Sequence, residues 1–365
     1  MKIVVSAFSN LYTDQRIEKV CDTLVRGGYD ITLIGNDYGG TGVLARPYPV
    51  KIIKQRSKSL KSAYPEFNWK LFFELRKTAD KNTILLANDL DALLPNVAIS
   101  KLLNIPLVFD SHEIFTEMPA IQGRFTQKIW RLLEKQLVPG IKYMMTESLS
   151  YANWFNEKYG VKPVVVRNIP KKITDLPMIP DNNPKIMLYQ GAINQSRGIP
   201  QAILATKYLD DIIFKIAGDG PKLNEYKALV QKEKLGGKVE FLGKLIPEEL
   251  RKVTRTADVA VSLEENGGVS YLYSLPNKVA DCIQARVPLV MINFPEMMRV
   301  YSEFKIGEIV ENHDPQNIAQ KIKSVLNNGR AYYQDELERA AAELCWENEE
   351  ENILTLFEKV VAENF

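Results

Sequence analysis

The sequence predicts an α/β protein of two Rossmann-like domains, each with a doubly wound parallel sheet, that face each other across a cleft. A length of 365 residues is typical of about two domains. Short apolar runs alternate with helical patterns along the chain, as they do in parallel sheets covered by helices on both faces. Residues 169–184 contain four prolines and little periodicity, which predicts a linker between the domains.

The first domain, residues 1–168, is expected to begin with a strand over Lys2–Ala7, a helix over Asp14–Arg26 closed by two glycines, and a strand over Asp30–Ile34. Its later strands are predicted at Val50–Ile53, Thr83–Ala87, Pro106–Phe109, Tyr143–Thr146 and Val164–Val166. Ligands of such sheets bind at the carboxyl ends of the strands. The residues that follow each strand are therefore the first candidates for function.

The second domain, residues 185–346, repeats this alternation. Its strands are predicted at Lys185–Tyr189, Ile212–Ala217, Val239–Leu242, Val259–Leu263, Leu289–Ile292 and Ile306–Val310. The chain from Asp335 onward is rich in Glu, Ala and Leu and predicts one or two amphipathic helices. Residues 347–365 are predicted to form a separate C-terminal helix. One option is that this helix returns to the first domain.

Composition favours a soluble cytoplasmic protein. Hydrophobic residues make up 45% and charged residues 25% of the chain, and no apolar run reaches the roughly 18 residues of a membrane span. The N-terminus enters a strand directly and lacks a signal-peptide pattern. Three scattered cysteines fit reduced thiols, and two histidines argue against a His-rich metal site.

The most informative stretch is 257–293. An apolar run ends at Glu264 and Glu265, a loop leads to Ser274-Leu275-Pro276-Asn277-Lys278, and a helical pattern over about 277–286 precedes another apolar run. Pro276 suits the first turn of a helix, and the N–H groups after it can bind an anion. Asp281, one turn later, can accept hydrogen bonds from ligand hydroxyls. A nucleotide-diphosphate site and an ordinary βαβ unit both fit these residues.

A glycine loop with one arginine, Gly191 to Gly198, follows the first strand of the second domain. Gly191 permits a tight turn near a ligand, and Arg197 offers a planar cation for a phosphate. The alternative is a solvated loop arginine. The loop is not a G-x-G-x-x-G fingerprint, which argues against a dinucleotide cofactor.

Two further strand ends are candidate walls of the same pocket. Gly218 opens a Gly-Asp-Gly-Pro turn in which Asp219 is expected to cap the next helix, while the backbone lines a nucleobase. Lys244 and Leu245 follow the strand after that one.

In the first domain, His112 follows a strand end and is expected to face the cleft. A capping or core histidine is the alternative. Asp89 and Asp91 form an Asp-x-Asp, which binds a divalent metal in some enzymes, but Asp91 precedes an apolar helical pattern and is interpreted as its N-cap. We therefore expect no metal site. His313 is assigned no role.

Taken in order, these motifs resemble those of glycosyltransferase family four, which has the GT-B fold. The residues that carry the resemblance are Tyr189-x-Gly191 with Arg197-Gly198, Gly218–Pro221, Val239–Gly243, and Ser274–Lys278 with Asp281, whose Pro-Asn-Lys is typical of one subgroup. Thr13–Ile17, Val108–Glu113 and Arg167-Asn168 are similar to motifs of the family's first domain. The resemblance covers most of the chain.

The resemblance implies retaining transfer, without metal or other cofactor, from a nucleotide-diphosphate sugar in the second domain to an acceptor in the first. It implies that His112 contacts the donor sugar and that Arg197 meets the diphosphate. Two departures stand out, because Tyr273 and Ala192 occupy places where the family has Glu and Arg. Lys278 is the candidate replacement for the missing cation, with an ordinary surface lysine as the alternative.

These departures keep two rival functions open, a non-catalytic nucleotide-sugar-binding subunit and a sugar-nucleotide epimerase of the same fold. The acceptor is predicted from charge. Residues 1–168 hold 23 Lys and Arg against 16 Asp and Glu, a net of +7, whereas the remainder has a net of −5.

Two groups of cations stand out in the first domain. The first group is Arg46, Lys51, Lys54, Arg56, Lys58 and Lys61, and the second lies in a helical stretch and is Arg124, Lys128, Arg131 and Lys135. The second group is interleaved with apolar residues. This pattern suits an anionic membrane surface, a groove for a glycan or lipid-linked acceptor, or a solvated basic face. No segment matches a nucleic-acid-binding module, so nucleic acid is not an expected partner.

Overall fold

The computed structural model describes residues 1–365 except 13, 37–43, 58 and 176–177. It divides into two compact units, Met1–Asn168 with Glu349–Phe365, and Ile169–Asn348. Thr13, Lys58 and residues 176–177 of the expected linker lie outside the described residues. None of the described helices combines the length and the apolar character needed to cross a membrane.

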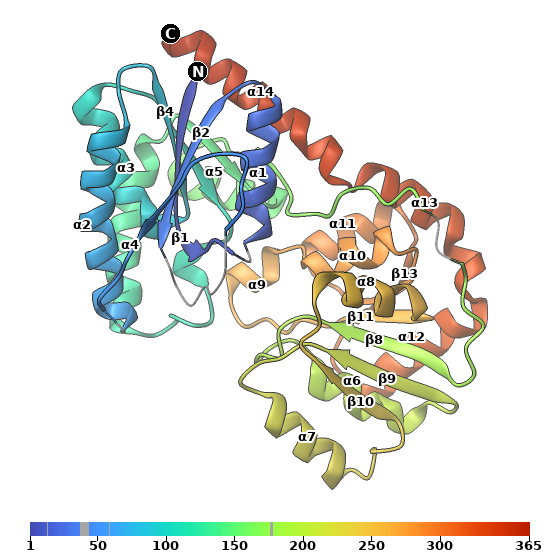
Figure 1. Cartoon of the computed structure of the whole chain (residues 1–365). Helices are drawn as coiled ribbons and strands as arrows, with labels where there is room; N and C mark the ends of the chain where they lie inside the picture. Colours follow the sequence, from blue (N-terminus) through green and yellow to red (C-terminus); the bar gives the residue numbers. More distant parts are fainter. Residues whose placement is uncertain (13, 37–43, 58, 176–177) are drawn as a thin grey trace. The chain divides into compact units, whose positions relative to one another are not determined.

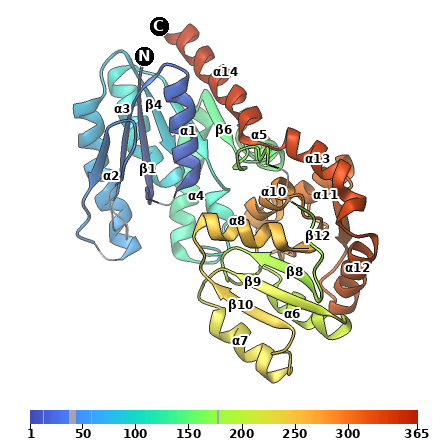
Figure 2. The same cartoon turned by 45° about the vertical axis from the view of Figure 1, so that its right-hand side comes forward.

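The first unit is a seven-stranded parallel sheet in the order β3-β2-β1-β4-β5-β6-β7. Its strands are β1 Lys2–Asn10, β2 Asp30–Asn36, β3 Val50–Ile53, β4 Thr83–Asn88, β5 Leu107–Ser111, β6 Tyr143–Thr146 and β7 Val164–Val165. Its helices are α1 Gln15–Arg26, α2 Leu60–Thr78, α3 Leu90–Leu103, α4 Phe125–Leu137, α5 Leu149–Tyr159 and most of α14 Trp346–Asn364. In Figures 1 and 2, α2 and α3 cover one face of the sheet, and α1 and α14 cover the other.

The second unit is a six-stranded parallel sheet in the order β10-β9-β8-β11-β12-β13. Its strands are β8 Lys185–Gln190, β9 Ile212–Ala217, β10 Val239–Gly243, β11 Val259–Ser262, β12 Leu289–Ile292 and β13 Gly307–Val310. Its helices are α6 Ile199–Ala205, α7 Leu223–Lys232, α8 Pro247–Thr256, α9 Val269–Tyr273, α10 Asn277–Gln284, α11 Pro295–Glu303, α12 Pro315–Asn328 and α13 Gln334–Glu343.

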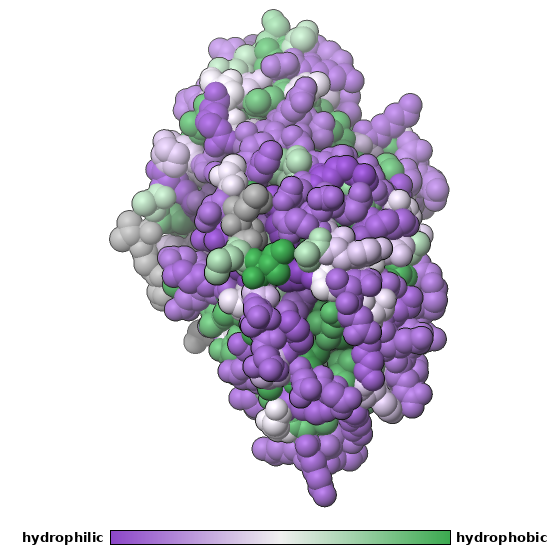
Figure 3. Space-filling view, turned by 90° about the vertical axis from the view of Figure 1, so that its right-hand side faces the viewer, coloured by the Kyte–Doolittle hydropathy of each residue, from purple (hydrophilic) through white to green (hydrophobic). Residues whose placement is uncertain are grey.

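The prediction of two doubly wound parallel sheets is confirmed. The central strands are buried on both faces because most of their residues are apolar, as in β4 and β12, and helices cover both sides. Cys21, Cys282 and Cys345 are buried and free. The face seen in Figure 3 is mostly hydrophilic, with apolar side chains in small groups.

Strand order reverses between β1 and β4 in the first unit and between β8 and β11 in the second. Such switch points leave a crevice at the carboxyl ends of the two central strands, where ligands of open α/β sheets bind. Asn88 ends β4, Asp89 follows it, Gly191 follows β8 and Glu264 follows β11, so both groups of candidate residues begin at these points. His112 follows the neighbouring strand β5.

Candidate functional site

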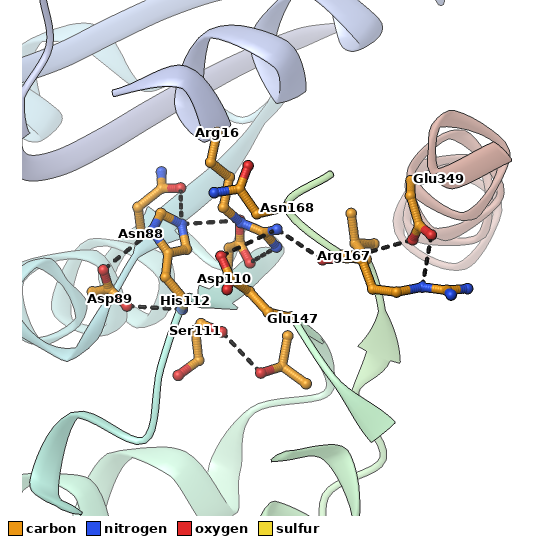
Figure 4. A network of polar contacts seen from close by, with 12 residues as sticks. Arg16, Asn88, Asp89, Asp110, Ser111, His112, Glu147, Arg167, Asn168 and Glu349 are labelled. Carbon is orange, nitrogen blue, oxygen red and sulfur yellow. Dashed lines mark hydrogen bonds and ion pairs between the residues drawn. The ribbon is translucent and has the colours of Figure 1, made fainter. Parts of the chain in front are cut away.

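The carboxyl ends of β4 and β5 bring four polar residues of the first unit together (Figure 4). His112 Nε2 lies 3.1 Å from Asn88 Oδ1 and 3.2 Å from Asp110 Oδ2, and its Nδ1 lies 3.3 Å from Asp89 Oδ2. The imidazole is therefore held on both edges by protein groups. Its predicted contact with a donor sugar stays a prediction.

Asp89 holds the turn that presents His112. Its φ of 59° is in the left-handed region, which a residue other than glycine occupies at a cost of roughly 1–3 kcal/mol. The turn is fixed because the Asp89 N–H donates to Asp110 O at 2.8 Å and the His112 N–H donates to Asp89 Oδ1 at 2.9 Å. Backbone strain and two convergent bonds mark a built site.

The N-cap prediction for Asp91 is wrong. Helix α3 begins at Leu90, with Asp89 at the cap position and no capping bond from its side chain. Asp91 lies in the first turn, buried, and burial raises the pKa of its carboxyl well above the ordinary value. Within the described residues, no group of three or more His, Cys, Asp and Glu side chains could hold a metal.

Arg16 is a member of the network to which sequence analysis assigned no role. It is buried, and it donates to both carboxylate oxygens of Asp110, from Nε at 3.0 Å and Nη2 at 2.6 Å. Its Nη1 donates to Val166 O at 2.7 Å and lies 3.7 Å from Glu147. Although burial opposes the charge on Asp110, Arg16 and His112 hold its pKa down, at about 2.

The surroundings of His112 favour the imidazolium form. Burial disfavours its charge, but the carboxylates of Asp89 and Asp110 raise its pKa to about 10. A protonated imidazole cannot act as a general base near neutral pH. It can stabilise negative charge and orient neighbouring oxygens.

We expect this charge to make stability depend on pH. A raised folded-state pKa adds stability that is complete below about pH 6.5, the unfolded value, and is lost as pH rises through about 10. The His112→Asn variant should therefore be less stable than wild type by a few kcal/mol at pH 6.5, and the gap should shrink toward pH 10. Urea unfolding at several pH values measures it. A gap that does not change with pH would contradict the assignment.

In the second unit, three charged side chains meet at the switch point between β8 and β11. Glu264 follows β11 and is fully buried, and its Oε1 accepts a bond from Lys278 Nζ at 2.6 Å. Arg197 Nη1 lies 3.8 Å from the same oxygen, and Ser262 Oγ donates to Glu264 Oε2 at 2.7 Å. Burial opposes the charge of Glu264, but Lys278 and Arg197 lower its pKa below the ordinary value.

Two aromatic rings fix the cations above Glu264. Lys278 Nζ lies 4.2 Å from the centroid of the Tyr189 ring, and the Arg197 guanidinium lies 4.4 Å from that of Tyr271. Cations over ring faces are attracted to the ring quadrupole. Two cations share one carboxylate, so the cluster keeps an excess positive charge. Lys278 is buried and does not fit the surface-lysine interpretation.

The glycines of the motifs let loops approach one another. A Cβ on Gly198, at φ +67°, would stand 1.9 Å from Leu263 O, so only glycine lets the Arg197 loop pack against the end of β11. A Cβ on Gly218, at φ +152°, would stand 1.9 Å from Gly191 O. A Cβ on Gly191 would meet Lys278 Cε at 3.7 Å. The loops after β8 and β9 and the start of α10 thus converge.

Asp281 is half-buried, and its Oδ2 accepts a bond from Gln190 Nε2 at 3.0 Å. Thr254 Oγ1 donates to Gln190 Oε1 at 2.6 Å, so the amide is fixed. The carboxylate is oriented by the protein, and its hydrogen bonds with ligand hydroxyls stay a prediction. Helix α10 begins at Asn277, so Pro276 is its N-cap and not part of the first turn.

The remaining sequence candidates lie around this cluster. Ser274 and Leu275 are half-buried in the turn before α10, while Lys244 is exposed and Leu245 is half-buried after β10. The Gly218 N–H donates to Gly243 O at 2.8 Å, which joins the ends of β9 and β10. The prediction that Asp219 caps a helix is wrong, because α7 begins at Leu223 with Lys222 at its N-cap.

Glu264 is the main residue of this cluster to which sequence analysis gave no role. The one signal was an acidic residue directly after an apolar strand, with a lysine fourteen positions later. Nothing in the sequence pattern places two residues at that separation within hydrogen-bond distance.

Residues 178–343 match the family model described as glycosyl transferases group 1. No curated protein gave a significant sequence match.

Solved structures match along the whole chain. Sucrose-phosphate synthase from Thermosynechococcus elongatus is 15% identical with a TM-score of 0.82, and each chain is covered completely. Anabaena HepE in complex with UDP-glucose is 14% identical with a TM-score of 0.73, covering 100% of this chain and 99% of that one. A glycosyltransferase from Rickettsia africae is 13% identical with a TM-score of 0.72, covering 99% and 98%. The two units have the fold of GT-B glycosyltransferases.

Proposed function

We propose that this chain, with its group 1 match and its GT-B fold, moves a sugar from a nucleotide-diphosphate sugar to a glycan or lipid-linked acceptor. The observation that carries the proposal is the pair of cations, Lys278 and Arg197, held over the buried Glu264 at a switch point. Fixed cations beside a glycine loop suit a diphosphate. HepE binds UDP-glucose, which makes UDP the first nucleotide to test.

In the proposed reaction the bond between the sugar and the diphosphate breaks, and the diphosphate leaves with additional negative charge. Lys278 and Arg197 would stabilise that charge, and no metal or other cofactor would take part. His112, held between Asp89 and Asp110, would contact the donor sugar near the reaction centre. Retention of anomeric configuration, and synthesis of surface polysaccharide or glycolipid, belong to this proposal through the family resemblance.

Turnover of radiolabelled donor, with and without acceptor, tests the function. Transfer or slow hydrolysis that persists in EDTA is the expected result. Inversion at C2 of the sugar would indicate an epimerase, and binding without turnover would indicate a non-catalytic subunit. Loss of activity in EDTA that Mg²⁺ or Mn²⁺ restores would contradict the metal-independent part.

Replacing Arg197 with alanine should weaken nucleotide-diphosphate binding by roughly 1.5–3 kcal/mol, the range for a hydrogen bond to a charged group. The arginine side chain keeps 23% of its surface exposed, so it can reach a ligand from its place over Tyr271. Calorimetry with UDP measures the change. The control is Arg299→Ala on α11, and unchanged affinity in Arg197→Ala would remove Arg197 from the site.

The acceptor side of the proposal rests on α4. This helix exposes Phe125, Ile129 and Leu132, at 75%, 47% and 56%, and buries Gln127 and Glu134. Its cations Arg124, Lys128 and Lys135 are exposed as well, whereas Arg131, also exposed, is paired with Glu117. An outward face of apolar and basic residues is typical of helices at an anionic membrane.

The start of α2 lies beside α4, because Tyr64 packs on Trp130 with ring centroids 5.1 Å apart. Lys54, Arg56 and Lys61 are exposed. Lys51 bonds Thr78 at the far end of α2, and Arg46 is paired with Glu18, so neither belongs to this surface. Helix α4 and the exposed cations of residues 54–61 are the surface that we assign to an anionic lipid.

We expect the protein to sediment with anionic vesicles at low salt and much less at high salt, since each basic residue near an anionic surface contributes about 1 kcal/mol. Phe125→Ala/Ile129→Ala should reduce the bound fraction severalfold, because it removes the inserted apolar groups. Tyr332→Ala, at a residue 70% exposed in the second unit, is the control. A protein that stays in the supernatant under all conditions would favour a soluble acceptor.

A further inference from the structure

The carboxyl ends of β11, β12 and β13 surround a pocket of about 470 Å³ that the proposed reaction does not use. We call it the β11–β13 pocket, and its lining residues are Gln201, Glu265, Asn266, Ile292, Asn293, Phe294, Glu311, Asn312 and His313. All of them belong to the second unit. The volume is in the range of small-molecule sites, and the strand ends are where sheets of this kind bind ligands.

The lining is layered by polarity. Ile292 and Phe294 are buried and supply an apolar floor. Gln201, Glu265 and His313 are half-buried and form the wall. The rim consists of exposed amides and one carboxylate, which are Asn266, Asn293, Asn312 and Glu311. A saccharide has the matching surface, with C–H groups on its ring faces and hydroxyls at its edges.

The wall has unused capacity to accept hydrogen bonds. Gln201 Nε2 donates to Glu265 Oε1 at 2.9 Å, which orients the Glu265 carboxylate, an acceptor-only group, in the wall. The His313 ring has Nε2 at 3.0 Å from Leu263 O, so this nitrogen carries the proton and, in the neutral ring, Nδ1 is an acceptor. A ligand with several hydroxyl donors would satisfy these atoms.

The charge of the lining selects against anions. Glu265 and Glu311 are carboxylates, and the residues that line this described pocket include no lysine or arginine. A phosphate group would therefore meet repulsion without a compensating cation. We propose that the β11–β13 pocket binds a neutral saccharide, with hydroxyls on the wall and rim and a ring face on the floor.

This site is separate from the cation cluster, although one chain segment serves both. The side chain of Glu264 faces Lys278, whereas the next residue, Glu265, lines the pocket. The Glu265 N–H also donates to Ser196 O at 3.0 Å, beside Arg197. The proposal does not depend on transferase activity, because the pocket and its chemistry are independent of the diphosphate site.

Saturation-transfer NMR on the full chain tests the proposal, with maltose, cellobiose, lactose and N,N′-diacetylchitobiose as probes, with and without UDP. At least one disaccharide should receive saturation in both conditions, and glucose 6-phosphate should not compete with it. The rim variant Asn266→Ala/Glu311→Ala should raise its Kd about tenfold, as expected for the loss of a few hydrogen bonds. Gln231→Ala/Glu240→Ala, an exposed amide and carboxylate of the same unit, is the matched control.

Each of three results would overturn the proposal. They are the absence of NMR saturation transfer to all four disaccharides, an unchanged Kd in the rim variant, and displacement of the bound disaccharide by UDP. Donor turnover is measured separately. If wild type turns over the donor but binds none of the disaccharides, this site alone is rejected. If wild type binds a disaccharide in the pocket but does not turn over any donor, the transferase proposal alone is rejected.

Discussion

Replacing Lys278 with methionine is expected to lower kcat/KM for donor turnover by roughly 100- to 1000-fold, the scale of removing one preorganised charge from a leaving-group site. The lysine is buried beside the Gly191 loop and is fixed by Glu264 and the Tyr189 ring. Because it is already in place, it would stabilise the departing diphosphate without reorganisation. Steady-state kinetics with the radiolabelled donor measure the loss.

Two further variants separate catalysis from folding. Lys278→Met leaves Glu264 buried without its closest cation, so the double variant with Glu264→Gln removes the stranded charge and should fold while remaining inactive. Lys305→Met is the matched control, since Lys305 also lies over a tyrosine ring, at 4.3 Å from that of Tyr301. Activity within about threefold of wild type in the folded double variant would contradict the role of Lys278.

Ala192→Arg offers a test by rescue. Ala192 is exposed in the glycine loop, at the place where the resembled family carries an arginine. Adding this cation to Lys278→Met should recover part of the lost turnover if the site requires charge and not lysine itself. No recovery would mean that the position of the Lys278 ammonium matters more than its charge.

The largest stability effect is expected at Arg16. Arg16→Met should destabilise the first unit by roughly 3–5 kcal/mol, because it leaves Asp110 buried without its bidentate partner. Tryptophan fluorescence during urea unfolding reports mainly on this unit, since Trp69, Trp130 and Trp154 lie in it and only Trp346 lies outside. The midpoint of that transition measures the loss.

Arg131→Met is the matched control, because the Arg131 side chain is 50% exposed and its pair with Glu117 is worth at most about 1 kcal/mol. The double variant Arg16→Met/Asp110→Asn should be more stable than Arg16→Met, since it removes the unpaired charge. Equal effects of Arg16→Met and Arg131→Met would show that the buried pair does not hold the His112 site together.

Much of the fold could be predicted from the sequence because parallel strands that are buried on both faces appear in the sequence as continuous apolar runs. Strands such as Tyr143–Thr146 and Leu289–Ile292 were predicted with their observed bounds. Helix starts were less predictable. Asp14, predicted as the first residue of a helix, is the N-cap of α1. Asp91 and Asp219 do not cap α3 and α7 as expected, because a capping residue type does not reveal where tertiary packing begins the helix.

The candidate site was predictable only in part. The glycines and the Pro-Asn-Lys turn are local signals, and they placed Gly191 and Arg197 in the loop after a strand and Lys278 at the start of a helix. Glu264 and the Arg16 to Asp110 pair make long-range contacts, with Arg16 and Asp110 standing 94 positions apart in the sequence. A single sequence carries no signal for such pairs, so their roles emerged from the structure.

The most direct test of the central claim is calorimetry of UDP against UMP, with GDP and ADP in parallel, on wild type and on the double variant Lys278→Met/Glu264→Gln. If Lys278 and Arg197 recognise the second phosphate, wild type should bind the diphosphate at least about tenfold more tightly than the monophosphate. The double variant should lose most of that preference while its affinity for the monophosphate changes little. Equal affinities of wild type for the diphosphate and the monophosphate of every base tested would contradict the claim.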